Sequence, residues 1–201
     1  GLLAALSAGR SGARVMIVDD NTHPGGYLRK SQAQINGRPA VDWVAAVIAE
    51  LDANPEVTHL QESTVWGYRE NNLLVITERT PAETHVFQRG WKARACHVVV
   101  ATGAIERNLV FNNNDRPGIM LASAVQAYLN EFGVIPGHSP IIFTNNSSAY
   151  QLAHELQAAG TKVAGMVDSR PADAIGAERD GLKTPLYAGH QILTTHGGKH
   201  I

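Results

Sequence analysis

The sequence predicts an α/β domain whose parallel strands are covered by helices, and three observations support this fold class. A helical stretch that Gly12 ends is followed by the apolar run Val15–Val18 and then by Asp19. The same order of helix, glycine, strand and acid recurs between residues 147 and 168. A third apolar run spans residues 98–101. Helices that alternate with continuous apolar strands are typical of βαβ units, in which both faces of the sheet are buried.

The composition is that of an ordinary globular domain. The chain has 201 residues, of which 44% are hydrophobic and 17% charged, and its formal net charge is −1. No basic stretch is dense enough to suggest a nucleic-acid-binding surface, and every apolar run is far shorter than the ~20 residues of a membrane helix. The single cysteine, Cys96, excludes an internal disulfide and precedes an apolar run, so we expect it to have a packing role. We expect a cytoplasmic protein with neither nucleic-acid nor membrane partners.

In the first half of the chain, small and apolar side chains at helical spacing predict helices over residues 2–11 and 41–51. Residues 21–26 have the composition of a turn, and Asn71 with Asn72 that of a hairpin turn. Short strands are expected at residues 57–60, 64–68, 73–78, 85–94 and 98–101.

In the second half, a polar loop leads to a helix at residues 122–132, and a strand, a helix and a strand are expected at residues 140–144, 147–159 and 162–167. Strand-like segments follow at residues 191–201. We therefore expect two Rossmann-like units in a chain truncated at both ends. The first spans residues 1–121 with a β insertion at about residues 64–94, and the second, incomplete, spans residues 122–201.

The spacing of Gly1, Ala5, Gly12 and Asp19 matches the later part of the dinucleotide-binding fingerprint. That fingerprint needs a glycine or alanine where the helix approaches the strand, and an acid at the end of the next strand that accepts hydrogen bonds from the ribose hydroxyls. The two earlier glycines and the first strand lie outside this sequence, so the helix N-terminus that meets a pyrophosphate is incomplete. Taken alone, this half fingerprint is explained equally well by an ordinary αβ unit.

Two flanking motifs favour nucleotide binding. Gly25 and Gly26 follow the strand-end acid at the distance where many flavoproteins place a glycine turn over the nucleotide. The run from Val98 into Ala101-Thr102-Gly103 is the second signature of flavoproteins with two dinucleotide-binding domains. The second unit instead has Thr144-Asn145-Asn146-Ser147-Ser148-Ala149 in place of a glycine-rich turn. We expect this second unit to be scaffold that has lost or altered nucleotide binding.

One block of the sequence resembles a known family. Residues 101–111, ATGAIERNLVF, and residues 114–122, NDRPGIMLA, are similar to the α subunit of heterotetrameric sarcosine oxidase and to related opine- and cyanide-forming amine oxidoreductase subunits. Residues 64–68, TVWGY, and 91–95, WKARA, also resemble that family. Asn108 stands where the family usually has proline, and Tyr27 where it usually has serine or threonine.

The resemblance implies a hetero-oligomeric flavoenzyme that oxidatively demethylates sarcosine or a related secondary amine. It implies NAD in the dinucleotide domain, FAD in the β subunit, and FMN between the two subunits, with the amine substrate bound outside this chain. The adenosine half that Asp19 would bind is common to NAD and FAD, so FAD remains the alternative in the first unit. The nucleotide contacts implied by position are Gly1, Asp19, Asp20, Asn21, Gly26, Tyr27, the Val65 backbone, Ala101, Thr102 and Gly103.

Two other functions remain possible from the sequence. A self-contained FAD-dependent NAD(P)H oxidoreductase has the same fold, but it is disfavoured by the missing Cys-x-x-Cys motif and the altered second glycine turn. The third possibility is a non-catalytic scaffold subunit. His196 and His200 flank a flexible Gly197-Gly198 segment and make a poor metal site. We predict no catalytic residue and no metal site in this chain.

Overall fold

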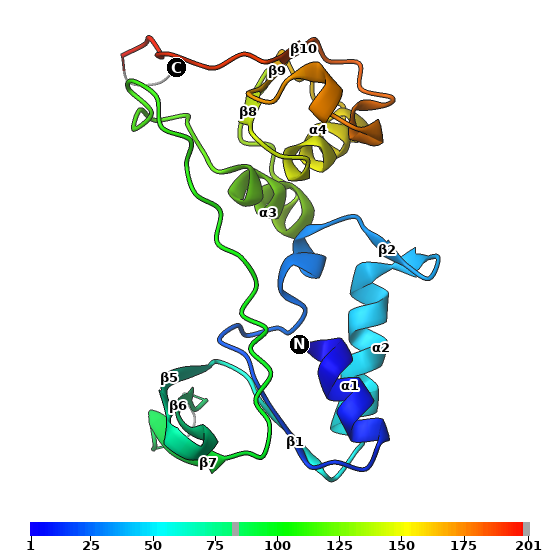
Figure 1. Ribbon diagram of the computed structural model, residues 1–201, viewed down its shortest axis with the longest axis vertical. Coiled ribbons are helices and arrows are strands. Elements are labelled where there is room, and N and C mark those ends of the chain that lie inside the picture. The colour runs from blue at the N-terminus through cyan, green and yellow to red at the C-terminus, as the bar shows by residue number, and fades with distance from the viewer. Residues whose placement is uncertain (82–84, 199–201) are drawn as a thin grey trace. The chain divides into compact units, whose positions relative to one another are not determined.

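The computed structural model describes residues 1–81 and 85–198. The chain divides into two compact units, which we describe separately (Figure 1). The first comprises Gly1–Arg29 and Ala33–Ala104, and the second comprises Lys30–Gln32 and the chain from Ile105 onward. No helix in the described part of the chain is long and apolar enough to cross a membrane.

The first unit contains a parallel two-stranded sheet with two helices packed against it. Helices α1 (Leu2–Arg10) and α2 (Ala40–Asp52) pack on strands β1 (Val15–Val18) and β4 (Val57–Leu60). Their shared core is formed by buried apolar side chains of both helices, namely Ala5, Leu6, Val47 and Leu51. The predicted helices and strands of this region are therefore confirmed, within one or two residues at each end.

A small hairpin that the sequence analysis missed lies between β1 and α2. Strands β2 (Gln34–Ile35) and β3 (Arg38–Pro39) pair antiparallel across Asn36 and Gly37, whose φ angles are 53° and 75°. An Asn-Gly pair with both residues at positive φ is the preferred two-residue hairpin turn. This dipeptide was the signal that could have predicted the hairpin.

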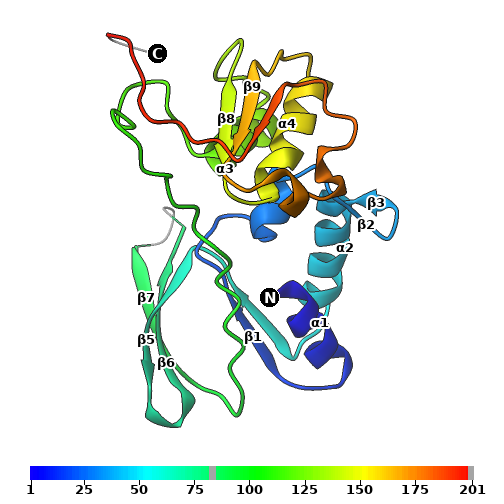
Figure 2. The same ribbon diagram turned by 45° about the horizontal axis from the view of Figure 1, so that its top comes forward.

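The rest of the first unit is a three-stranded antiparallel sheet, shown in Figure 2. It consists of β5 (Ser63–Arg69), β6 (Leu73–Arg79) and β7 (Gln88–Arg94), with β6 in the centre. Asn71 and Asn72 turn the chain between β5 and β6 at φ angles of 57° and 51°, as the sequence predicted. The register of β5 against β6 shifts between Val65 and Gly67, which leaves Trp66 in a β-bulge.

The second unit is built on a parallel sheet in the order β10-β9-β8. Its strands are β8 (Ile141–Thr144), β9 (Gly165–Asp168) and β10 (Leu186–Ala188), and its helices are α3 (Ala122–Phe132) and α4 (Ser148–Ala158). The core centres on α4 and β9, with Tyr150, Ala153 and Met166 fully buried. The second βαβ pattern is therefore confirmed, whereas β10 was not predicted.

Three expectations are wrong. Residues 98–101 form no strand, because no described strand lies beside them to complete the hydrogen bonds, and Val99 and Val100 are 69% and 73% exposed. Cys96 is exposed, so it has no packing role. In the described part of residues 191–201, the β pairing is limited to an isolated bridge between Thr194 and Asn112; residues 199–201 lie outside the described residues.

Candidate functional site

Asp19 is fixed at the carboxyl edge of the first sheet, where β1 ends. Its backbone N–H donates to the Leu60 carbonyl at 2.9 Å, and its own carbonyl accepts from the Ser63 N–H at 2.9 Å. Asp19 is therefore held between the end of β4 and the start of β5. In open parallel sheets, this edge is where ligands bind.

Only one oxygen of the half-buried Asp19 carboxylate has a protein partner among the described residues. Oδ1 accepts from the backbone N–H of Asn21 at 3.0 Å and from its side-chain amide at 2.9 Å. The same amide also donates to Asp20 at 2.9 Å, so Asn21 ties the two carboxylates together. Oδ2 of Asp19 accepts no hydrogen bond within the described chain, which leaves an oriented acceptor for an added hydroxyl.

The structure brings Gly1 next to the Ala101-Thr102-Gly103 segment. A Cβ atom on Gly1 would lie 3.5 Å from the Cβ of Ala101, an ordinary van der Waals contact. Gly1 also caps α1, because its carbonyl accepts the Ala5 N–H at 3.0 Å. All three residues of the segment are exposed, and Gly103 adopts a φ of +72°. The start of α1 and this exposed segment therefore border the same surface.

The two glycines after β1 have different roles. Gly25 has a φ of +119°, and a Cβ there would lie only 3.0 Å from Cγ1 of the buried Val44 on α2. Gly26 has a φ of +51° but open space around its Cα. Gly25 is thus required for packing against α2, while Gly26 is required only for its backbone conformation.

Tyr27 and Val65 complete the predicted set, and both are exposed. Tyr27 lies on the 3-10 turn Gly26–Lys30, and Val65 lies on β5, two residues after Ser63. The structure therefore joins Asp19, Asp20 and Asn21 by hydrogen bonds and Gly1 to Ala101 by proximity. The glycine turn contacts α2.

This arrangement fits the adenosine half of a dinucleotide. A ribose diol needs an oriented carboxylate with unused acceptor capacity, which Asp19 provides. The phosphates need backbone close to a helix N-terminus, and Gly1 at the start of α1 carries no side chain there.

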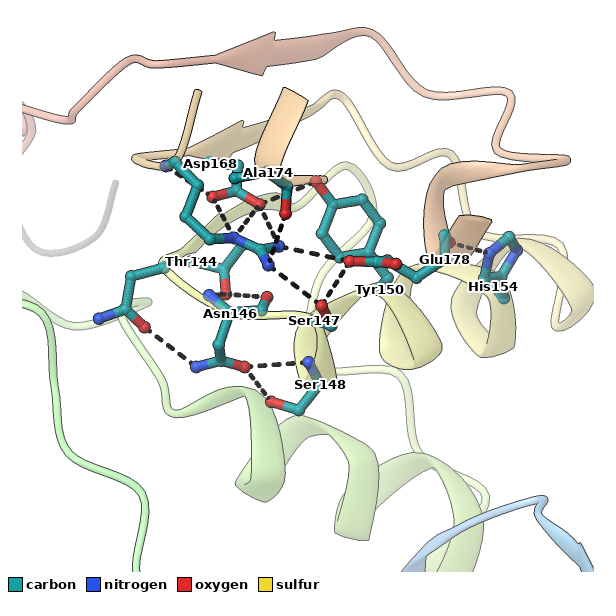
Figure 3. Close-up of polar contacts among 11 residues, drawn as sticks. Thr144, Asn146, Ser147, Ser148, Tyr150, His154, Asp168, Ala174 and Glu178 are labelled. Carbon is teal, nitrogen blue, oxygen red and sulfur yellow. Dashed lines mark hydrogen bonds and ion pairs between the residues drawn. The ribbon is translucent and has the colours of Figure 1, made fainter. Parts of the chain in front are cut away.

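The corresponding acid of the second unit, Asp168, differs from Asp19 in its burial and hydrogen bonding (Figure 3). Asp168 at the end of β9 is fully buried, and both of its carboxylate oxygens are occupied. The Tyr150 hydroxyl donates to it at 2.9 Å, and Arg170 donates through its guanidinium at 2.7 Å and its backbone N–H at 2.9 Å. Asp168 therefore has no accessible oxygen for a ribose.

These contacts set the ionisation of the cluster. Burial, and then the hydrogen bond to Asp168, raise the pKa of Tyr150 to about 12. Burial by itself would raise the pKa of Asp168, but the hydrogen bonds from Arg170 and Tyr150 outweigh it and hold that pKa below its usual value. The carboxylate is thus stabilised in its charged form by groups of its own unit.

The turn that precedes α4 is also satisfied internally (Figure 3). The side-chain oxygen of Asn146 accepts the Ser148 N–H at 2.9 Å and the Ser148 hydroxyl at 2.6 Å. The Ser147 hydroxyl donates to the Glu178 carboxylate, which also lies 3.6 Å from Arg170. The hydrogen bond from Ser147 lowers the pKa of Glu178. A carboxylate of the chain itself therefore occupies the start of α4.

The sequence analysis identified neither Tyr150 and Arg170 as partners of Asp168 nor Glu178 as the partner of Ser147. The one available signal was the position of Arg170, two residues after the strand-end acid Asp168. The hydrogen bond between Ser147 and Glu178 could not be predicted, because the two residues lie far apart in the sequence.

Two residues of the 101–122 block and its surroundings have structural roles. Glu106 accepts the backbone N–H groups of Ala122 at 3.1 Å and of Ser123 at 2.7 Å, so its carboxylate caps α3. Arg116 donates to the Gly197 carbonyl. Within the described residues, no group of three or more His, Cys, Asp or Glu side chains could hold a metal ion; His200 lies outside those residues.

The fold defines a class: an α/β domain of the Rossmann type. Solved structures share this fold. L-proline dehydrogenase from P. horikoshii superimposes with a TM-score of 0.64 at 21% identity, over 83% of this chain and 32% of that one. Thioredoxin reductase from Lactococcus lactis gives a TM-score of 0.67 at 15% identity, over 99% of this chain and 64% of that one.

Sequence comparison identifies the relatives. Over its whole length the chain is 44% identical to the sarcosine oxidase alpha subunit of Rhizobium meliloti (strain 1021), and over 90% of its length it is 47% identical to that of Corynebacterium sp. (strain U-96). An opine oxidase subunit from Agrobacterium tumefaciens (strain Ach5) is 28% identical over 88% of the chain and 36% of that protein. The chain is thus a homologue of sarcosine oxidase alpha subunits and spans about a fifth of those relatives' length (21% and 20%). No family model matches it.

Proposed function

We propose that this chain is the dinucleotide-binding part of the α subunit of a sarcosine oxidase-like flavoenzyme complex. That complex would be an oxidoreductase acting on CH–NH groups, which oxidatively demethylates sarcosine or a related secondary amine. The proposal is supported by the 44–47% identity to sarcosine oxidase alpha subunits and by the geometry around Asp19. Like the relatives, whose names designate subunits, the chain would act within a hetero-oligomer.

The first unit would hold NAD, or FAD as the alternative. Asp19 would accept the ribose hydroxyls through its free Oδ2, with Asp20 and Asn21 keeping its carboxylate in place. A bound nicotinamide or flavin would supply the redox chemistry, while the residues of this chain bind and orient the nucleotide. The Val65 backbone and the segment from Ala101 to Gly103 would border the nucleotide.

Gly25, Gly26 and Tyr27 would form the turn that borders the phosphates. The β subunit, the amine-binding pocket, and the FAD and FMN held elsewhere in the complex would lie outside this chain. We further propose that the complex is cytoplasmic. No step of the chemical reaction is assigned to a side chain of these 201 residues.

The difference between Asp19 and Asp168 carries this proposal. Asp19 keeps one carboxylate oxygen free at the edge of its sheet, whereas both oxygens of Asp168 are occupied by Tyr150 and Arg170. One nucleotide in the first unit and none in the second is the expected result. This difference argues against a self-contained FAD-dependent NAD(P)H oxidoreductase, which needs both units.

The test is to purify the complete protein that contains this chain with the other subunits of its complex and to identify the nucleotides released on denaturation. We expect one NAD or FAD per chain from this unit. Asp19→Ala should weaken its retention by about 10- to 100-fold, because hydrogen bonds to a charged group contribute about 1.5–3 kcal/mol. Glu56→Ala is the matched control, since Glu56 is exposed and directly precedes β4, at the opposite edge of the sheet.

Release of neither NAD nor flavin from the complex would refute the proposal. Unchanged nucleotide content and activity in Asp19→Ala would instead favour a non-catalytic scaffold. Rapid bleaching of a bound flavin by NAD(P)H would favour the self-contained FAD-dependent NAD(P)H oxidoreductase.

A further inference from the structure

The three-stranded sheet of the first unit has a charge very different from that of the chain. Strands β5, β6 and β7 contain five Lys or Arg residues and a single acid, Glu78, whereas the whole chain has a net charge of −1. The basic side chains are Arg69, Arg79, Arg89, Lys92 and Arg94. A local excess of this kind creates a positive potential on a chain that otherwise carries more acids than bases.

The register of the strands places four of these cations on one face. Residues directly opposite each other in an antiparallel sheet share a face, and alternate residues along a strand return to it. Leu73 pairs with both Arg69 and Arg94, and Val75 pairs with Lys92. On β6, Arg79 lies on the same face as Leu73 and Val75.

The single acid of the sheet lies on the opposite face. Glu78 pairs in register with Ser63 and Arg89, and its carboxylate accepts from the Trp91 indole N–H at 2.8 Å and from Arg89 at 3.3 Å. It is therefore already engaged, and it cannot neutralise the other face. We call the face that bears Arg69, Arg79, Lys92 and Arg94 the basic face.

The basic face also presents an exposed tryptophan. Trp66 is 62% exposed, and its indole N–H donates to the Thr77 hydroxyl at 3.1 Å, which fixes the ring on the same face. Arg69 extends along this face, because its Nε lies 3.9 Å from the position that a Cβ on Gly67 would take. Trp and Arg are the residue types most enriched among those that dominate the binding energy of protein interfaces.

The four cations are exposed, and none has an ion-pair partner within the part of the chain that the structure describes. We propose that the basic face docks onto an acidic surface of another subunit of the complex; this inference rests on the proposed function. Carboxylates of the partner would meet the four cations, and Trp66 would be buried between the two proteins. Complementary charge would speed association and fix the orientation of the two subunits.

Charge selects this occupant over a second copy of the chain. A two-fold contact would place the basic face of one copy against the same face of the other, so four cations would oppose four cations. Nucleic acid is a weaker candidate, because Trp66 is the single aromatic side chain that the register and contacts place on this face. Single-strand binding surfaces stack successive bases on several aromatic rings.

The test compares charge reversal on this face with the same reversal elsewhere. Lys92→Glu with Arg94→Glu should weaken assembly with the other subunits at least tenfold at low salt, and the salt dependence of the dissociation constant should flatten. Trp66→Ala should weaken assembly while leaving the salt dependence unchanged. Arg38→Glu with Lys162→Glu makes the same change in charge at exposed residues outside the three-stranded sheet of β5, β6 and β7. This control should leave assembly unchanged.

Circular dichroism and thermal unfolding would show that each variant folds. Assembly that is equally tight in the Lys92 and Arg94 variant and in its control would overturn the inference. So would binding of a 30-nucleotide single strand that this double substitution abolishes while assembly stays intact. The nucleotide content of the wild-type complex is measured alongside, so absence of both NAD and flavin from the wild type marks a failure of the proposed function, and not of the docking surface.

Discussion

The Tyr150 hydroxyl donates a 2.9 Å hydrogen bond to the Asp168 carboxylate inside the second unit. Asp168 is the last residue of β9, and Asp19 directly follows β1 in the first unit, so the two acids hold similar positions in the two βαβ patterns. Tyr150 projects from the first turn of α4, the helix that would cradle a phosphate if this unit bound a nucleotide. The contact therefore satisfies, within the unit itself, a carboxylate at the position that accepts from a ribose in nucleotide-binding units.

We predict that Tyr150 titrates separately from the other four tyrosines of the chain. Its pKa is raised to about 12, first by burial and then by the neighbouring carboxylate. Since this pKa lies above that of an unfolded tyrosine, about 10, the tyrosine favours the folded state below pH 10, and this contribution is lost as the pH rises through 12. The measurement is a series of stopped-flow jumps to alkaline pH, with phenolate absorbance read before the protein unfolds. It should show a component that titrates near pH 12, which we call the Tyr150 component.

Tyr150→Phe should remove the Tyr150 component and leave the rest of the titration curve unchanged. Tyr128→Phe, at an exposed site, is the matched control and should leave the Tyr150 component in place. A component near pH 12 that persists in Tyr150→Phe would contradict its assignment to Tyr150. The same substitution should cost about 1 kcal/mol in the free energy of unfolding, the usual net value of one hydrogen bond.

Arg170→Met should destabilise the protein by about 3 kcal/mol near neutral pH, because it leaves the fully buried Asp168 carboxylate without its cation. The pKa of Asp168 is held below its usual value, so the pair stabilises the fold above the unfolded pKa of about 3.9. That contribution is lost as the pH falls through the folded-state pKa. Urea unfolding should therefore show a difference from wild type that shrinks below about pH 4.

Arg10→Met is the control for this prediction. Arg10 forms an ion pair with Glu50 at 2.6 Å on the exposed surface, where such pairs contribute little. Its removal should shift the urea midpoint only slightly. An Arg170 variant as stable as the Arg10 variant would show that the Asp168 carboxylate does not depend on its cation.

The sequence predicted the repeating units well because their signals are local. Apolar runs such as Val15–Val18 and glycine stops such as Gly12 and Gly160 are set by spacing along the chain, and all appear in the structure. Residues 98–101 have an equally apolar pattern but form no strand. A strand requires a neighbouring strand for its hydrogen bonds, and a run of valines carries no information about whether that neighbour is present.

In the candidate site, too, position along the chain could be predicted from the sequence, but the surroundings of each side chain could not. Asp19 and Asp168 were both recognisable from their position after a strand, yet their surroundings are opposite. Asn21 leaves one oxygen of Asp19 free, whereas Tyr150 and Arg170 occupy both oxygens of Asp168. The difference depends on the side chains that α4 and the chain after β9 direct at the carboxylate. Spacing between motifs does not encode those directions.

Glu106→Ala should destabilise α3 by about 1 kcal/mol, since its carboxylate accepts two of the unpaired N–H groups at the start of that helix. Glu106→Gln should retain part of this effect, because its amide oxygen still accepts one bond but carries no charge to favour the helix dipole. Arg107→Gln, at the exposed next residue, is the control. Equal thermal unfolding midpoints in all three variants would refute the capping role.

Gly25→Ala should be more destabilising than Gly26→Ala, although both place an alanine at positive φ in the same turn. At Gly26, whose φ of +51° lies in the left-handed region, alanine costs roughly 1–2 kcal/mol, and at Gly25 the φ of +119° lies outside that region and is less favourable still for alanine. At Gly25 the new methyl would also lie 3.0 Å from Cγ1 of Val44, a buried residue of α2, and overpacking of this kind costs about 1–3 kcal/mol more. At Gly26 nothing lies within 4 Å of the added atom.

The difference between the two urea unfolding free energies therefore contains the steric contact with α2 and the less favourable backbone conformation of residue 25. Gly25→Ala combined with Val44→Ala supplies the internal check, because the smaller side chain removes the close approach and should recover part of the loss. If the two single variants were equally stable, the contact with α2 would not be what requires glycine at residue 25. Position 25 would then be constrained by its backbone conformation alone, as position 26 is.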